Sequence, residues 1–444
     1  MYTGDYSDEN IVAPAPFGYK LHVADPVFLP HDSRTHHLYI VGQTGVGKST
    51  LLKNLMAHDF EQSTGLAFID PHGDTAEWLL NHIPEWRLKN SEVVYWNVAD
   101  SDFPIGYNPL YNVPEQERHA AVEGIITSLR HIFAAQWSES RMEYLLTNTI
   151  AALIEAEGAT LLGVRRMLTD EGYRKSVRRT IRNPEVRTFW FDEYPKWPDR
   201  YRSEATPPIL NRVCRLFLNP LLRNILGQHK SAFDLGTLMN NNGILIVNLA
   251  EGLIGQQSAN LIGSFLISRF YQAAMARASA AHRPQFHLYV DEFTNFAAAE
   301  SFSRILSGAR KFGLGLTVAH QYIEQMPEAV RSAVFGTVGT LVSFRCSEYD
   351  AEFLERAMPH PSRDERLIDL ENYHVRIKRL AGGESLPAET LITYAPPSPQ
   401  EAHGLAYFVS EWTRAKYATP RADAEREIAA TWYPQNQNFD IRFD

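Results

Sequence analysis

The sequence predicts an α/β fold with a mainly parallel sheet, helices on both faces of the sheet and an inserted all-helical subdomain. Seven short apolar or β-branched runs have the composition of buried strands, and helical patterns separate most of them. No convincing strand signal occurs between about residues 111 and 236. With 444 residues, of which 44% are hydrophobic and 21% charged, the chain can bury a core of this kind.

The first expected strand, residues 37–41, leads directly into a glycine-rich turn at 42–47, and a helix is expected from residue 48. The other six expected strands are apolar runs of similar length at 66–69, 93–96, 243–249, 286–290, 314–319 and 340–344. Open α/β sheets bind ligands outside the carboxyl ends of their strands. The turn at 42–47 is therefore expected at a ligand-binding edge.

Residues 111–236 are expected to form the all-α subdomain. Ala120–Phe133 and Arg141–Ala156 carry apolar residues at helical spacing. Prolines predict breaks between the helices at 183–184, 194–195, 197–198 and 207–208.

These signals divide the chain into four expected parts. Residues 1–110 are an N-terminal segment with the first half of the core, and residues 111–236 are the helical subdomain. Residues 237–380 are the second half of the core, and residues 381–444 are a C-terminal helical tail. A short β-like piece is expected near 373–379, inside the third part.

Composition limits the possible functions. The net charge of −9 argues against a surface covered with phosphate-binding side chains, so any nucleic-acid contact is expected to be local. Basic runs at 165–166, 174–182 and 376–379 are most simply solvated helix faces. Two distant cysteines, Cys214 and Cys346, indicate neither a disulfide framework nor a zinc site.

Targeting and membrane signals are weak. The first ten residues are polar and acidic and do not resemble a signal peptide. The longest apolar stretches are far shorter than the ~20 residues that a membrane span requires. The expectation is a chain with no membrane span of its own and a cytoplasmic location.

The turn after the first strand has the composition of a phosphate-binding loop. Glycines at 42, 45 and 47 allow a tight turn with inward-pointing N–H groups, next to the positive end of a helix. Lys48 is expected to bridge the β- and γ-phosphates of ATP, and Ser49 to ligate Mg²⁺. The expected nucleotide contacts are Gly42, Thr44, Gly45, Val46, Gly47, Lys48, Ser49 and Thr50. A chance match is the alternative, but the motif has the strand before it and the helix after it that its mechanism requires.

Two further strand ends supply candidate catalytic groups. The strand 286–290 is followed by Asp291, expected to hold Mg²⁺, and by Glu292, expected to polarise the attacking water. Gln321 follows the strand 314–319 and could sense the γ-phosphate; alternatively, it only satisfies backbone groups at the strand end.

Five motifs in this order resemble the HerA/FtsK superfamily of hexameric, RecA-like P-loop ATPases that pump DNA, with the conjugative coupling proteins as the most similar branch. The motifs are Phe68–Asp74, Asn108–Leu110, Val290–Phe293, Ala309–Gly313 and His320–Gln321, within a resemblance that spans about 36–380. The resemblance implies that Arg310 is an arginine finger for a neighbouring subunit and that Gln321 is the sensor. It also suggests that the helical subdomain meets cargo.

The resemblance implies an ATP-driven homohexameric motor that moves double-stranded DNA through a ring lumen. A nuclease, relaxase or effector protein is a possible partner. The segment 251–258 is the best candidate for a lumen loop, because its glycines and amides suit backbone phosphate contact. Asp70 is a further site candidate, although turn chemistry also explains it, and Arg345 could sense phosphate or form a structural salt bridge.

The chain departs from the family in ways that limit the analogy. Transmembrane helices of coupling proteins, the β-barrel of HerA and the winged helix of FtsK have no visible counterpart. An ATP-gated recruitment platform and a protein pump therefore remain alternatives to DNA translocation.

Overall fold

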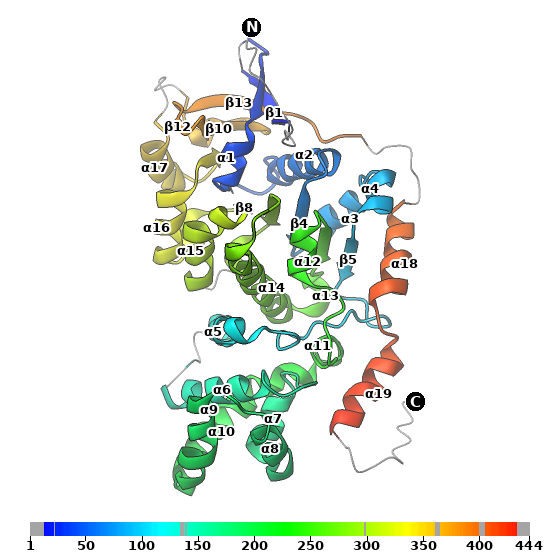
Figure 1. The fold of residues 1–444 in the computed structure, drawn as a ribbon. Helices are drawn as coiled ribbons and strands as arrows, with labels where there is room; N and C mark the ends of the chain where they lie inside the picture. The colour runs from blue at the N-terminus through cyan, green and yellow to red at the C-terminus, as the bar shows by residue number, and fades with distance from the viewer. Residues whose placement is uncertain are drawn as a thin grey trace.

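A single eleven-stranded sheet organises the protein in the computed structural model, which describes residues 13–21, 23–133, 137, 140–296, 299–359, 365–398 and 405–432. The strand order is β2-β1-β13-β10-β9-β3-β8-β7-β4-β6-β5. Figure 1 shows this sheet in the upper part of the molecule, with a group of helices below it.

The seven strands from β9 to β5 are parallel, and all seven were expected from the sequence. They are β3 (Leu38–Val41), β4 (Gly65–Asp70), β5 (Val93–Asn97), β6 (Ile244–Asn248), β7 (Phe286–Val290), β8 (Leu314–His320) and β9 (Thr340–Ser343). Nearly every residue in them is buried, because helices cover both faces of a parallel sheet. Continuous apolar runs are the sequence pattern that this environment favours.

Four antiparallel strands, which we call the edge strands, extend the sheet beyond β9. They are β1 (Ala15–Lys20), β2 (Pro26–Leu29), β10 (His374–Lys378) and β13 (Glu389–Thr393). β10 is the expected β-like piece. The basic run 376–379 was expected to be a solvated helix face, but this expectation is wrong, because the run begins in a strand and its Arg376 is buried. The segment 381–444, expected to be helical, begins with a small hairpin of β11 (Leu380–Ala381) and β12 (Glu384–Ser385), and then adds β13 to the sheet.

Helices pack on both faces of the sheet. On one face lie α2 (Lys48–Glu61), α3 (Asp74–Leu80) and α18 (Leu405–Tyr417), whose apolar side chains share a core with Ile40, Leu66 and Phe68. The other helices around the sheet are α1 (His31–Thr35), α4 (Glu85–Asn90), α12 (Leu235–Asn240), α13 (Glu251–Ile254), α14 (Gln256–Ala276), α15 (Ala299–Gly308), α16 (Glu328–Thr337) and α17 (Glu348–Ala357). The last helix, α19 (Arg421–Trp432), lies beside the lower group of helices and contacts α11 (Pro220–Leu226).

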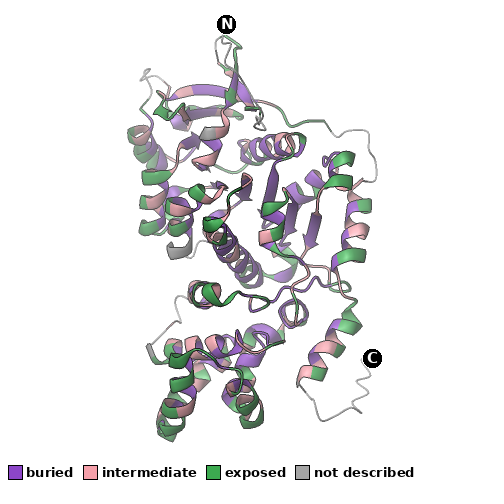
Figure 2. Ribbon diagram, viewed as in Figure 1, coloured by how far each residue is buried: buried purple, intermediate pink, exposed green. Residues whose placement is uncertain are grey.

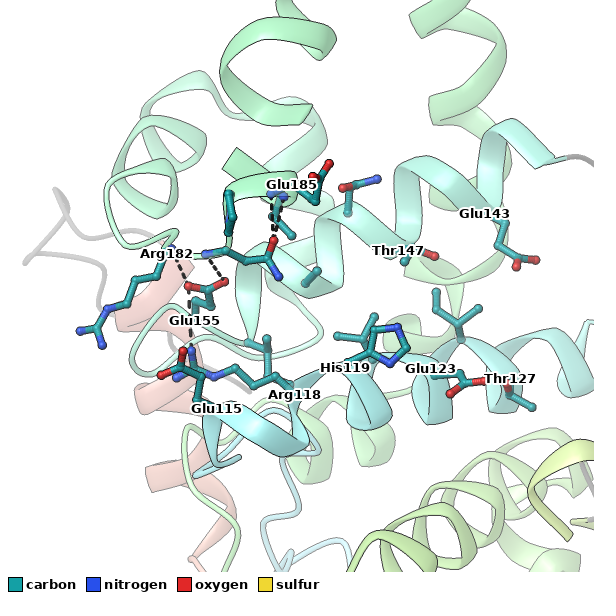
Figure 3. A pocket seen from close by; sticks show the side chains of 18 of the residues that line it. Glu115, Arg118, His119, Glu123, Thr127, Glu143, Thr147, Glu155, Arg182 and Glu185 are labelled. Atoms are coloured by element: carbon teal, nitrogen blue, oxygen red, sulfur yellow. Dashed lines mark hydrogen bonds and ion pairs between the residues drawn. The ribbon is translucent and has the colours of Figure 1, made fainter. Parts of the chain in front are cut away.

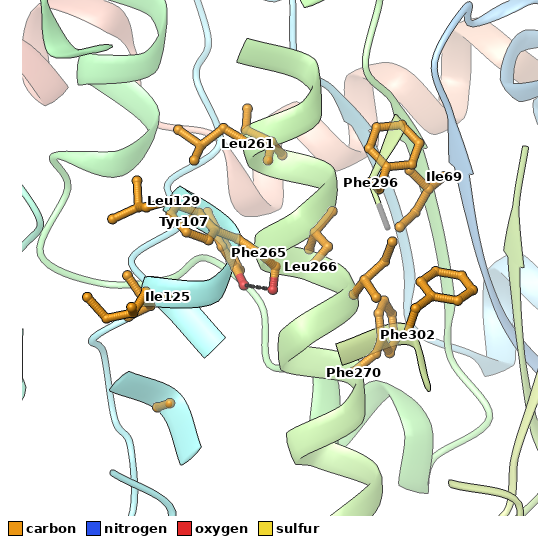
Figure 4. Packing of buried hydrophobic residues seen from close by; sticks show 14 of the residues in the cluster. Ile69, Tyr107, Ile125, Leu129, Leu261, Phe265, Leu266, Phe270, Phe296 and Phe302 are labelled. Carbon is orange, nitrogen blue, oxygen red and sulfur yellow. Dashed lines mark hydrogen bonds between the residues drawn. The ribbon is translucent and has the colours of Figure 1, made fainter. Parts of the chain in front are cut away.

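The long helix α14 connects the sheet to the helices below it. Its apolar residues pack toward Ile69, Phe296 and Phe302 on the sheet side, and toward Ile125 and Leu129 of the next layer (Figure 4). A helix that is apolar on several faces is stable only when other elements surround it. Figure 2 shows α14 as the most continuously buried helix between the two parts of the molecule.

The described residues of 111–236 contain helices and no strand, as expected; we call them the helical insert. Its α-helices are α5 (Arg118–Ile132), α6 (Ser140–Leu153), α7 (Gly163–Thr169), α8 (Glu171–Arg178), α9 (Pro184–Thr188), α10 (Asp199–Arg212) and α11 (Pro220–Leu226). The predicted break at 207–208 is wrong, because α10 continues through Pro207 and Pro208. A proline removes its own backbone N–H bond but keeps a helical φ, so packing at buried Ala205 and Ile209 can carry the helix past it.

No helix within the described part of the chain is both long and apolar enough to cross a lipid bilayer.

Candidate nucleotide-hydrolysis site

The glycine-rich turn 42–47, which we call the phosphate loop, joins the carboxyl end of β3 to the start of α2. Its first two backbone N–H groups are bound by the neighbouring strand ends: Gly42 donates to the His320 carbonyl (3.3 Å) and Gln43 to the Arg345 carbonyl (2.9 Å). A Cβ on Gly42 would lie 2.6 Å from Cβ of Phe344, so a side chain cannot be placed there without moving the backbone. The loop is thus fixed at the sheet edge where ligands are expected.

Gly45 and Gly47 have left-handed backbone conformations, with φ of 78° and 120°. Side chains other than hydrogen are strained at such angles, and a Cβ on Gly47 would also lie 2.8 Å from Cδ1 of Tyr373. Thr44, Gly45 and Ser49 are exposed around the loop, whereas Val46 is buried beneath it. The residues predicted to contact phosphate therefore form one continuous loop that opens to solvent.

Lys48 is buried and points back across the mouth of the loop. Its Nζ donates to the carbonyls of Gly42 (2.7 Å) and Gln43 (2.9 Å). Burial lowers the pKa of Lys48, and the negative charges of Glu292 and Asp291 oppose that shift. Lys48 thus places a positive charge beside both acids. In a water-poor site, such a charge can also offset the negative charge of a bound phosphate.

Asp291 and Glu292 follow β7, two strands away from β3. Burial, followed by the charges of Glu292 and Asp70, raises the pKa of Asp291 to about 7. The Glu292 backbone is left-handed (φ 44°), and its N–H donates to the Asp291 carboxylate (3.0 Å). This sharp turn presents both carboxylates at the same sheet edge. A buried carboxylate beside Lys48 fits a Mg²⁺–nucleotide, since Mg²⁺ prefers few carboxylates together with phosphate oxygens.

Gln321 lies where the sequence predicts, directly after β8, and it contacts Glu292. Its Nε2 donates to Oε1 of Glu292 (3.0 Å), so its amide does more than satisfy backbone groups at a strand end. Beneath it, the buried His320 shares a 2.7 Å hydrogen bond between its Nε2 and the Tyr39 hydroxyl. The Tyr39–His320 pair was not predicted, because the two residues are 281 positions apart.

Asp70 ends β4 near these acids but is occupied by backbone groups. One carboxylate oxygen accepts from the His72 N–H (3.0 Å), and the other accepts from the N–H groups of Thr75 (3.1 Å) and Ala76 (2.9 Å) at the start of α3. These contacts are those of a turn and a helix start. They favour the turn interpretation, with Asp70 acting on the site through its charge on Asp291.

Arg310 lies at the opposite end of the sheet from the phosphate loop. It is exposed in a short 3₁₀ turn, Ala309–Phe312, that precedes β8, whereas Gln321 follows that strand. Seven residues of strand separate the two ends by about 23 Å. Burial lowers the pKa of His37, at the start of β3, to about 4, and the charge of Arg310 contributes to that shift. The turn that carries Arg310 is thus remote from the phosphate loop of its own chain.

Arg345 supports the loop rather than standing free beside it. Its guanidinium donates to Oε1 of Gln43 (3.4 Å), to the Leu370 carbonyl (3.2 Å) and to Oδ1 of Asn372 (3.1 Å). Within the described part of the chain these partners are neutral, so Arg345 does not form the salt bridge that was one alternative. Its guanidinium is also held by the loop and its neighbours rather than free to meet phosphate.

The segment 251–258 was expected to be a loop. It instead forms the helix α13 followed by the first turn of α14. Gly255, with φ of 82°, joins the two helices. Gln256 and Gln257 remain exposed at the start of α14. The prediction is wrong because Glu251–Ile254 forms one helical turn after the left-handed Ala250. The glycines in this segment favour a loop in the sequence pattern.

The helical insert contains a cavity of about 750 Å³ between α5, α6 and the start of α9 (Figure 3). Its wall combines apolar groups such as Val122 and Ile126 with charged ones such as Arg118 and Glu155. Glu155 accepts the backbone N–H groups of Arg182 (2.6 Å) and Asn183, which fixes the start of α9 at the cavity edge.

Comparison with solved structures identifies the fold. The plasmid coupling protein TrwB, solved in complex with the non-hydrolysable ATP analogue ADPNP, matches with a TM-score of 0.60 and 16% identity, over 90% of this chain and 92% of that one. The TrwB complex with ADP and Mg²⁺ gives a TM-score of 0.58 at 16% identity over the same shares. This chain has the fold of a conjugative coupling protein.

VirB4 of Thermoanaerobacter pseudethanolicus also matches, with a TM-score of 0.53 and 14% identity over 87% of this chain and 97% of that one. No protein-family model matches the chain, and no curated protein matches its sequence. The RecA-like, P-loop NTPase fold and the likeness to coupling proteins expected from the sequence are confirmed.

Proposed function

We propose that this chain is an ATP-hydrolysing motor that works as a homohexameric ring and translocates double-stranded DNA. The observation that carries the hydrolytic part is the meeting of Lys48, Asp291 and the bonded pair Glu292–Gln321 at one sheet edge. The likeness to TrwB solved with ADPNP, and with ADP and Mg²⁺, supports ATP and Mg²⁺ as the ligands.

Each residue has a separate task in this proposal. The loop N–H groups and Lys48 hold the triphosphate and offset its charge. Ser49 and Asp291 hold Mg²⁺, which when bound would screen the phosphate oxygens. Glu292 orients the attacking water and accepts its proton, and Gln321 reports the presence of the γ-phosphate through its hydrogen bond to Glu292.

The position of Arg310 supports a ring. Because a full strand of about 23 Å separates Arg310 from the sheet edge that carries its own phosphate loop, Arg310 can assist hydrolysis only in a neighbouring subunit. A ring in which each subunit supplies Arg310 to the next has heterologous contacts that close on themselves.

DNA as the cargo rests on the fold likeness to coupling proteins, and the acidic charge of the chain limits where DNA can be contacted. A net charge of −9 favours a confined contact, for which Gln256 and Gln257 at the exposed start of α14 are the candidates. The cavity in the helical insert supports a second candidate function, in which ATP gates recruitment of a nuclease, relaxase or effector protein.

The test is the ATPase rate against double-stranded DNA concentration at two ionic strengths. A motor held by phosphate contacts should be stimulated by DNA of any sequence, and the stimulation should weaken steeply as salt rises. Replacing Gln256 and Gln257 together by glutamate should reduce the stimulation through charge repulsion.

Arg179→Glu provides the matched control, because Arg179 is exposed on the helical insert, whereas its neighbour Arg178 covers the Phe191 ring at 4.0 Å. This variant should keep the DNA response. A parent ATPase indifferent to DNA at low salt would exclude the motor and leave the recruitment platform or a protein pump as the better account.

A further inference from the structure

The strand order sets the direction in which a nucleotide lies across the phosphate loop. β3 stands between β8 and β7 on one side and β9 and β10 on the other. Glu292 and Gln321, the groups that act on the γ-phosphate, follow β7 and β8. The nucleoside end of the same molecule therefore extends toward β9 and β10.

Tyr373 occupies that side of the loop, directly before β10. Its side chain is 46% exposed, yet its ring packs against the loop, since a Cβ on Gly47 would lie 2.8 Å from Cδ1 of Tyr373. The Tyr373 N–H donates to the Val46 carbonyl (2.8 Å). One edge of the ring is thus fixed to the loop, while much of the ring is open to solvent.

The backbone of Tyr373 is held in an unfavourable conformation. Its φ of 67° is left-handed, which is uncommon for a bulky residue and often marks a functional position. The Tyr373 carbonyl accepts two hydrogen bonds from Thr393 of β13, from its N–H (2.9 Å) and its Oγ1 (3.1 Å). The edge strands and the phosphate loop together keep the ring in place.

We propose that Tyr373 stacks on the nucleobase of the bound nucleotide, an inference that rests on the proposed ATPase function. Stacking on an aromatic ring tolerates different bases, because every base has a π-face. Tyr373 therefore supplies affinity for purine nucleotides without distinguishing adenine from guanine. The phosphate loop binds the triphosphate, and Tyr373 binds the other end of the same ligand.

The experiment compares calorimetric binding of ATP, GTP and inorganic triphosphate, each with Mg²⁺, to the full chain. Tyr373→Leu keeps an apolar side chain against Gly47 but removes the aromatic face. It should weaken ATP and GTP by the same factor, about tenfold, and leave inorganic triphosphate binding unchanged. Tyr373→Phe should bind like the parent. Tyr349→Leu, at an exposed tyrosine of α17, is the matched control and should change none of the three affinities.

Two results would overturn the stacking role. Equal loss of ATP and inorganic triphosphate binding in Tyr373→Leu would mean that the ring only supports the loop. Unchanged ATP binding in that variant would mean that the base lies elsewhere. Failure of the proposed function gives a different result, because a parent that binds neither ATP nor inorganic triphosphate would refute the nucleotide site as well as the stacking.

Discussion

Lys48 makes contacts with the loop backbone that a phosphate can replace. Lys48→Ala removes the cation from the loop mouth and leaves α2 with a good helix former, so nucleotide binding and turnover should be lost while the fold persists. Calorimetric titration with Mg²⁺–ATP and thermal unfolding measure the two effects. Lys53→Ala, on the same helix, is the control and should still bind. Full ATPase activity in Lys48→Ala would contradict the assignment of the loop.

Glu292 combines a hydrogen bond to Gln321 with the charge needed to activate water. Glu292→Gln keeps a side-chain oxygen for the 3.0 Å bond and removes the charge, so the variant should bind Mg²⁺–ATP normally and hydrolyse it at least a hundredfold more slowly. Pre-steady-state and steady-state ATPase assays separate binding from turnover. Glu324→Gln, an exposed neighbour of the same region, should remain active. A variant that hydrolyses ATP at the parent rate would remove Glu292 from the mechanism.

The residues of the site differ in how far the sequence could predict them. The phosphate loop, Asp291, Glu292 and Gln321 follow strands whose apolar runs are recognisable locally, so their common edge could be predicted. Arg345 follows the expected strand 340–344 and was a candidate phosphate sensor, but Tyr373 could not be related to the loop in this way. Tyr373 lies next to the loop because β10 pairs with β9 beside β3, and such long-range pairing has no local signal.

At the scale of elements, a buried ion pair joins α1, α2 and β7 below the site. Arg34 donates to both carboxylate oxygens of Asp59 (2.6 and 2.7 Å). The Tyr289 hydroxyl accepts a hydrogen bond from Arg34 and donates one to the Asp59 carboxylate. Burial raises the pKa of Asp59, but Arg34 outweighs burial and holds it below its usual 3.8. The contribution of Asp59 to stability is therefore complete above that pKa and lost as the pH falls through the lower folded value.

Asp59→Asn should destabilise the protein by about 3–5 kcal/mol, because it leaves the Arg34 guanidinium buried without a counter-charge. Replacing both partners, Arg34→Met with Asp59→Leu, should cost less than the single change. Urea unfolding at neutral pH measures both variants. A double variant that is less stable than Asp59→Asn would show that the pair contributes more than mutual neutralisation.

The elements also differ in predictability. The parallel strands are buried on both faces and carry unbroken apolar runs, which local patterns detect. The edge strands β1, β2 and β13 contain prolines, glycines and polar residues, and they are stable only through their neighbours in the sheet. α10 shows the opposite error, because packing overrides the two prolines that predict a break.

At the scale of the whole molecule, the separation of Arg310 from the phosphate loop predicts complementation between subunits. Arg310→Ala rings should bind ATP but lose at least about 10³-fold in turnover. Mixing them with Lys48→Ala subunits should restore part of the activity, because an intact loop can then face an intact arginine. Native mass spectrometry verifies the mixed rings, and Lys311→Ala provides the exposed neighbouring control. Verified mixed rings without any recovery would place Arg310 outside the neighbour's site.

The pairing of β3 also governs when the site can form during synthesis. Both neighbours of β3 in the sheet come from the last third of the chain, and Tyr39 and His320 across one of these pairings are 281 positions apart. At a translation rate of about 5–20 residues per second, β3 waits roughly 15–60 seconds on the ribosome for a partner. Throughout that interval β3, an apolar strand, lacks both of its neighbours in the sheet. We therefore expect nucleotide binding to begin only after β8 and β9 have been synthesised.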